Sequence, residues 1–561
     1  MRKFKTILLL VFIFIYSIQL FSQPVRARNG MVVSASDLAT EVGLEILKKG
    51  GNAIDAAVAV GFALAVTYPI AGNLGGGGFL VYYRNDGFST TIDFREKAPL
   101  KAYQNMYLDS LGNPQYHLSQ TGVTSVGVPG SVDGLLYALK KYGTMKLKDV
   151  IDPAIRLARK GFTLNYDLCN SINSNYENFM KYPSSRKIFT KNGEKFKEGD
   201  IFIQKDLANT LELIKKYGRK GFYEGKVAQL IVKQIQSEGG YITLEDLKNY
   251  NCVERKPVEG FYRGYKIISM GPPSAGGVAL FEALNILENI NFNPNDYHSS
   301  KHLHYLIETL KRVYYDRAEY LGDSDFVKVP VNKLISKDYS KKLFSDIDSL
   351  NSTMPELIDT KKYFELESTE TTHYSIIDKW GNAVSVTTTI NSAFGSSVVV
   401  DGAGFLLNNE MDDFSIKPGV QNQFGLVSKE VNSIQPGKRM LSSMTPTIVL
   451  KDEKPFLILG SPGGSMIITS VLQVIMNVID FNMRLDAAVT YPRIHHQWVP
   501  PEVYFENYSI SDDVLKKLES MGHVFKKRNG IGRIEAILVD YDNQFIYGVT
   551  DPRGYGLAKG Y

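Results

Sequence analysis

The spacing of apolar residues predicts helices first and strands second in the N-terminal part of the chain. Residues 34–69, "SASDLATEVGLEILKKGGNAIDAAVAVGFALAVTYP", have the pattern of two helices broken at Gly50-Gly51, the second so rich in Ala and Val that it must be buried. Residues 75–96 contain two β-rich runs around Asn85-Asp86-Gly87, which is typical of a hairpin. Between about residues 130 and 345 the pattern is mostly amphipathic and indicates covering helices.

The pattern changes near residue 370. Residues 346–369 are polar and irregular, as in a linker, and residues 371–391, "TTHYSIIDKWGNAVSVTTTIN", alternate like two strands joined by a turn. Residues 446–480 then have the pattern strand, turn, strand, Gly-rich loop and helix. Strand pairs interleaved with helical layers predict a mixed α/β domain in which helices sandwich sheets.

The composition of the whole chain and of its first 22 residues indicates a globular protein with an N-terminal leader. The chain has 561 residues, of which 44% are hydrophobic and 22% charged, so it is globular. Arg2, Lys3 and Lys5 precede an apolar run over 7–20 that is shorter than a membrane span usually needs. We expect residues 1–22 to be a secretory signal and the mature protein to be periplasmic or secreted; an uncleaved N-terminal anchor is the alternative.

Charge and cysteine content exclude some functions. Loss of the three basic leader residues lowers the formal net charge from +5 to +2, and the remaining basic residues are scattered, so nothing favours nucleic acid or an acidic membrane as partner. Cys169 and Cys252 could form one disulfide or remain two buried thiols. The eight histidines have no metal-ligand spacing, and we expect no metal and no cofactor.

The turn of the 371–391 hairpin fixes its register. Asp378 and Gly381 suit a type I turn followed by a left-handed glycine, which gives the three-residue loop 379–381. This loop places Thr371 opposite Thr389 on the same strand face, with β-carbons within about 5.5 Å of each other. A two-residue loop would instead pair Thr371 with Thr388.

Paired threonines are ordinary in sheets, because threonine is a good strand former. The linker before Thr371 changes the interpretation. Cleavage between Glu370 and Thr371 would give one residue both a hydroxyl nucleophile and a free α-amine, which titrates near pH 8 and can act as the base. His373 lies on the same strand face as Thr371. Strand packing is the favoured interpretation of this histidine, and a local role in cleavage is the alternative.

Two further groups of residues could complete such a site. Gly463 and Gly464, in "GSPGGS", come between a strand and a helix, where bare amides could form an oxyanion hole. Arginine and hydroxyls hold carboxylates, and carboxylates hold an ammonium group. An α-amino acid head group would therefore suit the candidate set of Arg95, Glu410, Asp413, Ser442 and Ser443.

Many motifs in order resemble the γ-glutamyltranspeptidase family, also called glutathione hydrolases, of the N-terminal nucleophile hydrolases. They span essentially the whole mature chain: "GNAIDAAVA", "GNLGGGGF", "DFRE", "GVPGSV", "DRAEYLGD", "TTHYSIIDKWGNAVSVTTTIN", "LLNNEMDDF", "LSSMTPTIV" and "GSPGGS". The resemblance implies a four-layer αββα sandwich and autocatalytic cleavage before Thr371. The large subunit 23–370 and the small catalytic subunit 371–561 would stay associated as one intertwined domain.

The resemblance also implies roles. Thr371 would attack the γ-glutamyl carbonyl of glutathione, with transfer to water, an amino acid or a dipeptide; Thr389 would support it, and Gly463 and Gly464 would stabilise the oxyanion. The α-carboxylate would be held by Arg95, Ser442 and Ser443, and the α-amino group by Asn391, Glu410 and Asp413.

Related functions remain open. Phe424, in the segment 417–427 that resembles a bacterial lid, stands where several family members have tyrosine, so the lid gating and acceptor preference of those members do not carry over to this chain. An acylase or poly-γ-glutamate-cleaving enzyme could share the nucleophile, and an unprocessed binding or scaffold protein could share the fold. An acid at position 413 favours a substrate with an α-amino group.

Overall fold

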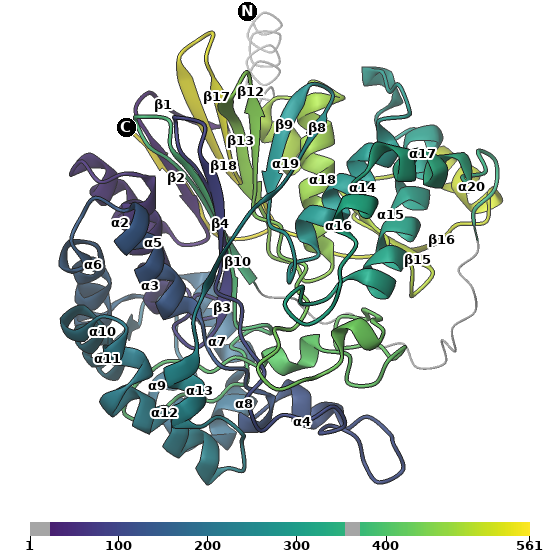
Figure 1. Cartoon of the computed structure of the whole chain (residues 1–561). Coiled ribbons are helices and arrows are strands. Elements are labelled where there is room, and N and C mark those ends of the chain that lie inside the picture. Colours follow the sequence, from purple (N-terminus) through teal and green to yellow (C-terminus); the bar gives the residue numbers. More distant parts are fainter. Residues whose placement is uncertain (1–22, 354–370) are drawn as a thin grey trace, which may run out of the picture.

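A computed structural model of the protein describes residues 23–353 and 371–561. Two seven-stranded sheets, in which every strand pairing is antiparallel, form its centre (Figure 1). The predicted leader, residues 1–22, and Glu370 lie outside the described residues, as does most of the predicted linker.

Each sheet contains strands from both sides of residue 370. Sheet A has the spatial order β1 (Val25–Ala27), β18 (Phe545–Thr550), β17 (Glu535–Asp540), β13 (Lys454–Gly460), β12 (Thr447–Lys451), β9 (Tyr265–Ser269) and β8 (Val258–Tyr262). Sheet B has the order β19 (Leu557–Gly560), β2 (Met31–Ser34), β10 (Thr371–Ile377), β11 (Ala383–Thr389), β3 (Gly77–Tyr83), β4 (Ser89–Asp93) and β7 (Val253–Arg255). The segments 23–353 and 371–561 are therefore interleaved in both sheets.

The two sheets pack face to face, and alternate residues along each strand point to different layers. In β10, Ile377 packs between the sheets, with Ile448 of β12 on the facing sheet. Its neighbour Ile376 belongs to a separate apolar cluster with the helices outside sheet B. Val449, next to Ile448, packs among the helices outside sheet A. All four side chains are buried, so both faces of both sheets are covered.

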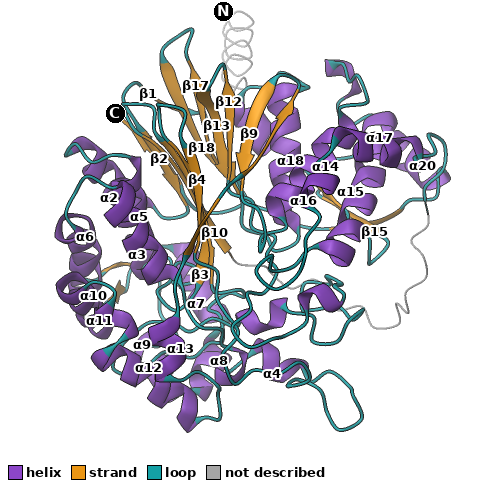
Figure 2. Ribbon diagram, viewed as in Figure 1, coloured by secondary structure: helices purple, strands orange, loops and turns teal. Residues whose placement is uncertain are grey.

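Helices lie on both outer sides of the pair of sheets (Figure 2). Sheet B is covered by α2 (Asp37–Lys48), α3 (Ala53–Thr67) and α5 (Ser131–Tyr142), with α6 (Leu147–Lys160) packed on α3. Sheet A is covered by α14 (Gly276–Leu287), α18 (Met466–Ile479) and α19 (Leu485–Thr490), with α15 (Ser300–Tyr320) packed on α14. The prediction of two helices broken at Gly50-Gly51 is confirmed, and every residue of α3 is buried.

Smaller elements complete the fold. Within residues 23–353 and 371–561, the other α-helices are α4 (Tyr116–Gln120), α7 (Tyr166–Ser174), α8 (Tyr176–Lys181), α9 (Pro183–Phe189), α10 (Lys205–Tyr217), α11 (Lys220–Tyr223), α12 (Gly225–Ser237), α13 (Leu244–Asn249), α16 (Val331–Leu334), α17 (Lys337–Ser345) and α20 (Asp512–Ser520). Short strands form two minor sheets: β5 (Phe162–Thr163) with β6 (Ile201–Phe202), and β14 (Ile494–His495) with β15 (Glu502–Phe505) and β16 (Val524–Lys527).

The prediction of covering helices over residues 130–345 is wrong at 253–269, where β7, β8 and β9 form instead. The β8–β9 turn contains Arg263 with φ 49° and Gly264 with φ 86°. Two consecutive left-handed residues are what a tight hairpin turn requires. Arg-Gly is a weaker hairpin signal in the sequence than Asn-Gly. The neighbouring segments have helical patterns, so the two strands were not predicted.

The two cysteines do not form a disulfide. Cys169 is buried and Cys252 half-buried, and both are free thiols. The structure therefore has two thiols where the sequence allows either arrangement.

Within residues 23–353 and 371–561, no helix has the length and apolar character needed to cross a membrane.

Candidate active site

The β10–β11 hairpin has the predicted register. Thr371 pairs with Thr389 and Ile377 with Ala383, so the three-residue loop is confirmed. The Asp378 amide donates to the Asn382 carbonyl over 3.1 Å, and Gly381 has φ 87°. The left-handed glycine sets the register of every pair along the hairpin.

Thr371 is buried at the open end of this hairpin, on the face toward sheet A. Its hydroxyl donates to the hydroxyl oxygen of Thr389 over 3.3 Å. The same Thr389 oxygen accepts the backbone N–H of Asn391 over 2.8 Å. Asn391 has φ 77°, which turns the chain sharply after β11, and it lines the same cavity as Thr371. Thr389 therefore orients the Thr371 hydroxyl and leaves the lone pairs of Thr371 available for attack on a substrate.

A row of polar side chains continues from Thr371 between the sheets. The His373 ring is hydrogen-bonded to Thr387 over 2.9 Å and to Ser375 over 3.0 Å. Burial lowers the pKa of His373 to about 3, so the ring is neutral at physiological pH. A β-carbon on Gly460 would lie 2.4 Å from this ring, so glycine is required there. Both ring nitrogens are engaged within the row, which favours the packing role over a role in cleavage.

The Gly463-Gly464 loop lies between β13 and α18. Gly463 has φ 129° and Gly464 has φ 54°, and both carbonyls accept amides of the first turn of α18. Among the described residues, no acceptor pairs with the amides of Gly463 or Gly464. The positive end of the α18 dipole points to the same place. The loop can therefore receive negative charge.

Arg95 follows β4 and lies at the centre of a buried ion cluster. Its guanidinium pairs with Glu410, with Asp413 at 2.5 Å and with Glu96 at 3.4 Å. Its Nε donates to the carbonyl of Met440 over 3.2 Å. The predicted carboxylate ligand, Arg95, thus pairs with two of the predicted ammonium ligands, Glu410 and Asp413.

Burial and mutual repulsion raise the pKa values of the acidic side chains in this cluster. Burial raises the pKa of Glu410 to about 7, although Arg95 opposes the change. Burial and the neighbouring Glu410 raise the pKa of Glu96 well above its usual range. Burial also raises the pKa of Asp413. All three carboxyl groups are therefore harder to ionise than exposed ones.

One small cavity, of about 20 Å³, joins these groups. Its lining includes most of the predicted site: Arg95, Thr371, Thr389, Asn391, Glu410, Asp413, Ser442, Ser443 and Gly464. Gly463 adjoins it through Gly464. Phe424 and Leu426, of the predicted lid segment, also line the cavity, and Phe424 is held by a bond from Gln497 Nε2 to its carbonyl over 3.1 Å.

Two residues of the site were missed from the sequence. Arg317, near the end of α15, lines the cavity and donates through Nη2 to the Ser443 hydroxyl over 3.2 Å. Glu96 pairs with the Arg95 guanidinium over 3.4 Å. Both residues lie inside recognised motifs, "DRAEYLGD" and "DFRE", but the helical and strand patterns give no sign that Arg317 lines the cavity or that Glu96 contacts Arg95.

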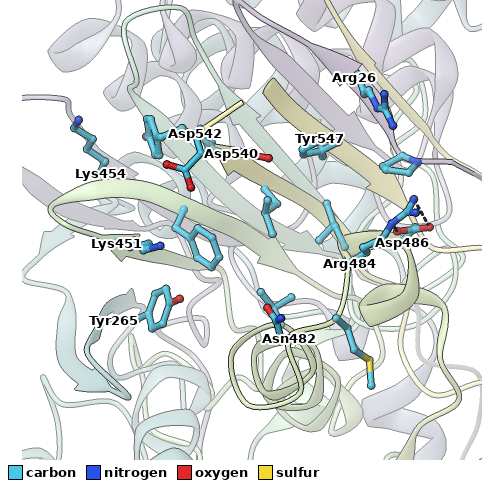
Figure 3. A pocket seen from close by; sticks show the side chains of 18 of the residues that line it. Arg26, Tyr265, Lys451, Lys454, Asn482, Arg484, Asp486, Asp540, Asp542 and Tyr547 are labelled. Atoms are coloured by element: carbon cyan, nitrogen blue, oxygen red, sulfur yellow. Dashed lines mark hydrogen bonds and ion pairs between the residues drawn. The ribbon is translucent and has the colours of Figure 1, made fainter. Parts of the chain in front are cut away.

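A much larger cavity, of about 740 Å³, lies elsewhere on the molecule (Figure 3). Tyr265, Lys451, Lys454 and Tyr547 line it, on the outer side of sheet A. It adjoins the Lys454 end of β13, whereas the Gly463-Gly464 loop follows the other end, about 20 Å along the strand. None of its lining residues belongs to the predicted site, so size does not identify the active site here.

Comparison with known proteins decides the family. The γ-glutamyltranspeptidase family model matches residues 39–561. The chain belongs to the γ-glutamyltranspeptidase family. A member from Escherichia coli described as glutathione hydrolase proenzyme is 48% identical over 96% of this chain and 93% of its own length. The described part of this γ-glutamyltranspeptidase chain has no cluster of three His, Cys, Asp or Glu side chains that could hold a metal ion. That the enzyme needs no metal stays a prediction.

Solved structures agree on the fold. Cephalosporin acylase from Bacillus halodurans has a TM-score of 0.85 and 28% identity, covering 97% of this chain and 98% of its own. γ-Glutamyltranspeptidase from Helicobacter pylori has a TM-score of 0.56 and 50% identity, covering 59% of this chain and 93% of that chain. The mixed α/β fold with two antiparallel sheets is therefore the fold of γ-glutamyltranspeptidases and of an acylase relative.

Proposed function

We propose that this enzyme cleaves the γ-glutamyl amide bond of glutathione and related compounds through a γ-glutamyl ester on Thr371. The observation that carries the proposal is the pairing of Thr371 with Thr389 at a cavity lined by Arg95, Asp413 and Ser443. The 48% identity to a glutathione hydrolase proenzyme supports the same substrate.

Maturation is part of the proposal. The chain cleaves itself between Glu370 and Thr371, giving a large subunit 23–370 and a small subunit 371–561. Both sheets contain strands of both segments, which supports their staying together as one αββα sandwich of the N-terminal nucleophile hydrolase type. The new α-amine of Thr371 then acts as general base.

The reaction follows from these positions. Thr371 Oγ attacks the γ-carbonyl carbon, and its proton passes to the α-amine of the same residue. The amides of Gly463 and Gly464 stabilise the oxyanion, and cysteinylglycine leaves from glutathione with that proton. Water then releases glutamate, or an amino acid or dipeptide takes the γ-glutamyl group. No cofactor enters any step.

Substrate binding replaces the internal ion pairs. In the proposed complex the α-carboxylate lies with Arg95, Ser442 and Ser443, and the α-amino group with Asn391, Glu410 and Asp413. A zwitterion inserted into the cluster gives each buried charge a new opposite partner, which offsets the loss of the Arg95 pairs. We also propose that residues 1–22 direct the protein to the periplasm or outside the cell and are then removed.

The acylase relative makes a second function worth testing, because its fold covers nearly the whole chain. Turnover of glutathione, a glutaryl amide and poly-γ-glutamate by the purified protein separates the candidates. We expect glutathione and γ-glutamyl anilides to react at least about 100-fold faster than a glutaryl amide, because the buried acids Glu410 and Asp413 lose their ammonium partner there. A preference for the glutaryl amide or the polymer would overturn the assignment. A chain that is never cleaved and turns over none of the three would be a binding or scaffold protein.

A further inference from the structure

Arg317 is a buried cation that lacks an ion-pair partner. It is 4% exposed, and no carboxylate of the described residues lies within ion-pair distance of it. Its Nη2 reaches Ser443, while Nε and Nη1 have no hydrogen-bond partner among the described residues. An unpaired buried guanidinium is costly unless an anion completes its surroundings.

Arg95, by contrast, has its donors engaged. Its Nη1 pairs with Glu410, its Nη2 with Asp413, and its Nε with the Met440 carbonyl. A carboxylate entering the cavity must break one of these pairs to be held by Arg95 alone. Arg317 lines the same cavity and has free N–H groups without any such loss.

Ser443 connects Arg317 to the predicted carboxylate site. Because its oxygen accepts a hydrogen bond from Arg317, its own hydroxyl proton is available for a different acceptor. Polarisation by a charged donor also makes that hydroxyl a stronger donor. Arg317 and Ser443 together thus offer a cationic donor set beside Thr371.

We propose that Arg317 is a specificity-determining residue, which supplies a cation for the α-carboxylate of the γ-glutamyl donor directly and through Ser443. This inference rests on the proposed function. With Arg317 included, two guanidinium groups face the carboxylates Glu410 and Asp413, so a zwitterionic head group leaves the site electrically balanced.

Three p-nitroanilide donors test the inference. L-γ-Glutamyl has both head groups, glutaryl lacks the amino group, and 4-aminobutyryl lacks the carboxylate. We expect Arg317→Gln to lower kcat/KM about 10- to 100-fold for the two donors with a carboxylate, mainly through KM, and less than about 3-fold for 4-aminobutyryl. Where the 4-aminobutyryl rate is too low, the inhibition constants of L-glutamate and 4-aminobutyrate give the same comparison.

Controls separate this role from a structural one. Arg317→Lys keeps the charge without the planar fork, and we expect the same selectivity with a smaller loss, including in the case that Arg317→Gln does not fold. Lys301→Gln changes an exposed cation on the same helix and should leave all three rates unchanged. Equal losses for all donors, or a larger loss for 4-aminobutyryl, would overturn the proposal. Lack of γ-glutamyl turnover by the wild-type enzyme would instead refute the proposed function.

Discussion

The hydroxyl of Thr371 donates to that of Thr389 across the open end of the β10–β11 hairpin, over 3.3 Å. Thr389 is itself fixed by the Asn391 amide at 2.8 Å, so it cannot turn away without losing that bond. Strand pairing thus positions the nucleophile and its supporting hydroxyl before any substrate binds.

Removal of the Thr389 hydroxyl should slow both processing and turnover. We expect Thr389→Ala to lower the rates about 10- to 100-fold, because loss of one buried hydrogen bond costs about 1–3 kcal/mol. Thr389→Ser should keep most of the activity. Fragment formation over time and the initial rate with L-γ-glutamyl-p-nitroanilide measure the two effects.

Thr388 offers the matched control. It lies on the opposite strand face, where its hydroxyl donates to the Gly77 carbonyl over 2.7 Å. Thr388→Val should lower stability slightly and leave the rate per processed molecule unchanged. Equal rate losses at 388 and 389 would show that strand integrity, and not orientation of Thr371, explains the effect.

The Gly464 amide should stabilise the oxyanion of the transition state, so a change at this residue should affect kcat more than KM. Gly464→Ala places a methyl group at the cavity, and we expect kcat to fall about 100- to 1000-fold with a small change in KM. Gly437→Ala is the control: Gly437 also has a positive φ, 73°, and open space around it. Both variants should lose about 1 kcal/mol of stability, measured by urea unfolding. If kcat falls equally in both variants, the loop does not form the oxyanion hole.

The pH dependence of kcat/KM should show the ionisation of Glu410. Its pKa is raised to about 7, and the ionised form is needed to hold the ammonium group, so activity is lost as pH falls through 7. The α-amine of Thr371 must also be unprotonated, so log kcat/KM should fall with a slope of about 2 at low pH. Glu410→Gln should reduce that slope to about 1. An unchanged slope would mean that Glu410 does not titrate in the free enzyme.

Gly460 should be intolerant of any side chain. A β-carbon there would lie 2.4 Å from the His373 ring, so we expect Gly460→Ala to cost about 1–3 kcal/mol of unfolding free energy. Gly530→Ala, where nothing lies within 4 Å, should cost much less. Thermal unfolding of both variants, each carrying Thr371→Ala to prevent processing, compares them. Similar melting temperatures would contradict the tight packing of His373.

The sequence predicts the hairpin well because its register depends on local turn chemistry. Gly381 alone decides between Thr389 and Thr388 as the partner of Thr371, and the glycine is visible in the sequence. The β8–β9 hairpin was missed because its turn pair, Arg263-Gly264, stands among helical patterns. Local signals therefore suffice where a turn residue is distinctive.

Convergence of distant residues is harder to predict. Arg317 comes from α15, on the sheet A side, and Glu96 from the segment that follows β4 of sheet B. Only the packing of these elements brings Arg317 into the cavity lining and Glu96 against Arg95. The pairing of Arg95 with Glu410 and Asp413 likewise depends on three-dimensional proximity. Motif order identifies such residues as belonging to the family, but their contacts follow from the fold.

The central claim is that Thr371 becomes a new N-terminus and the nucleophile. Intact mass measurement with N-terminal sequencing of the purified wild-type protein and of Thr371→Ala tests it most directly. We predict two associated wild-type fragments, the smaller beginning Thr-Thr-His-Tyr, and a single uncleaved chain for Thr371→Ala. A wild-type protein that turns over γ-glutamyl anilide as one chain, or a Thr371→Ala variant cleaved at the same bond, would contradict the claim.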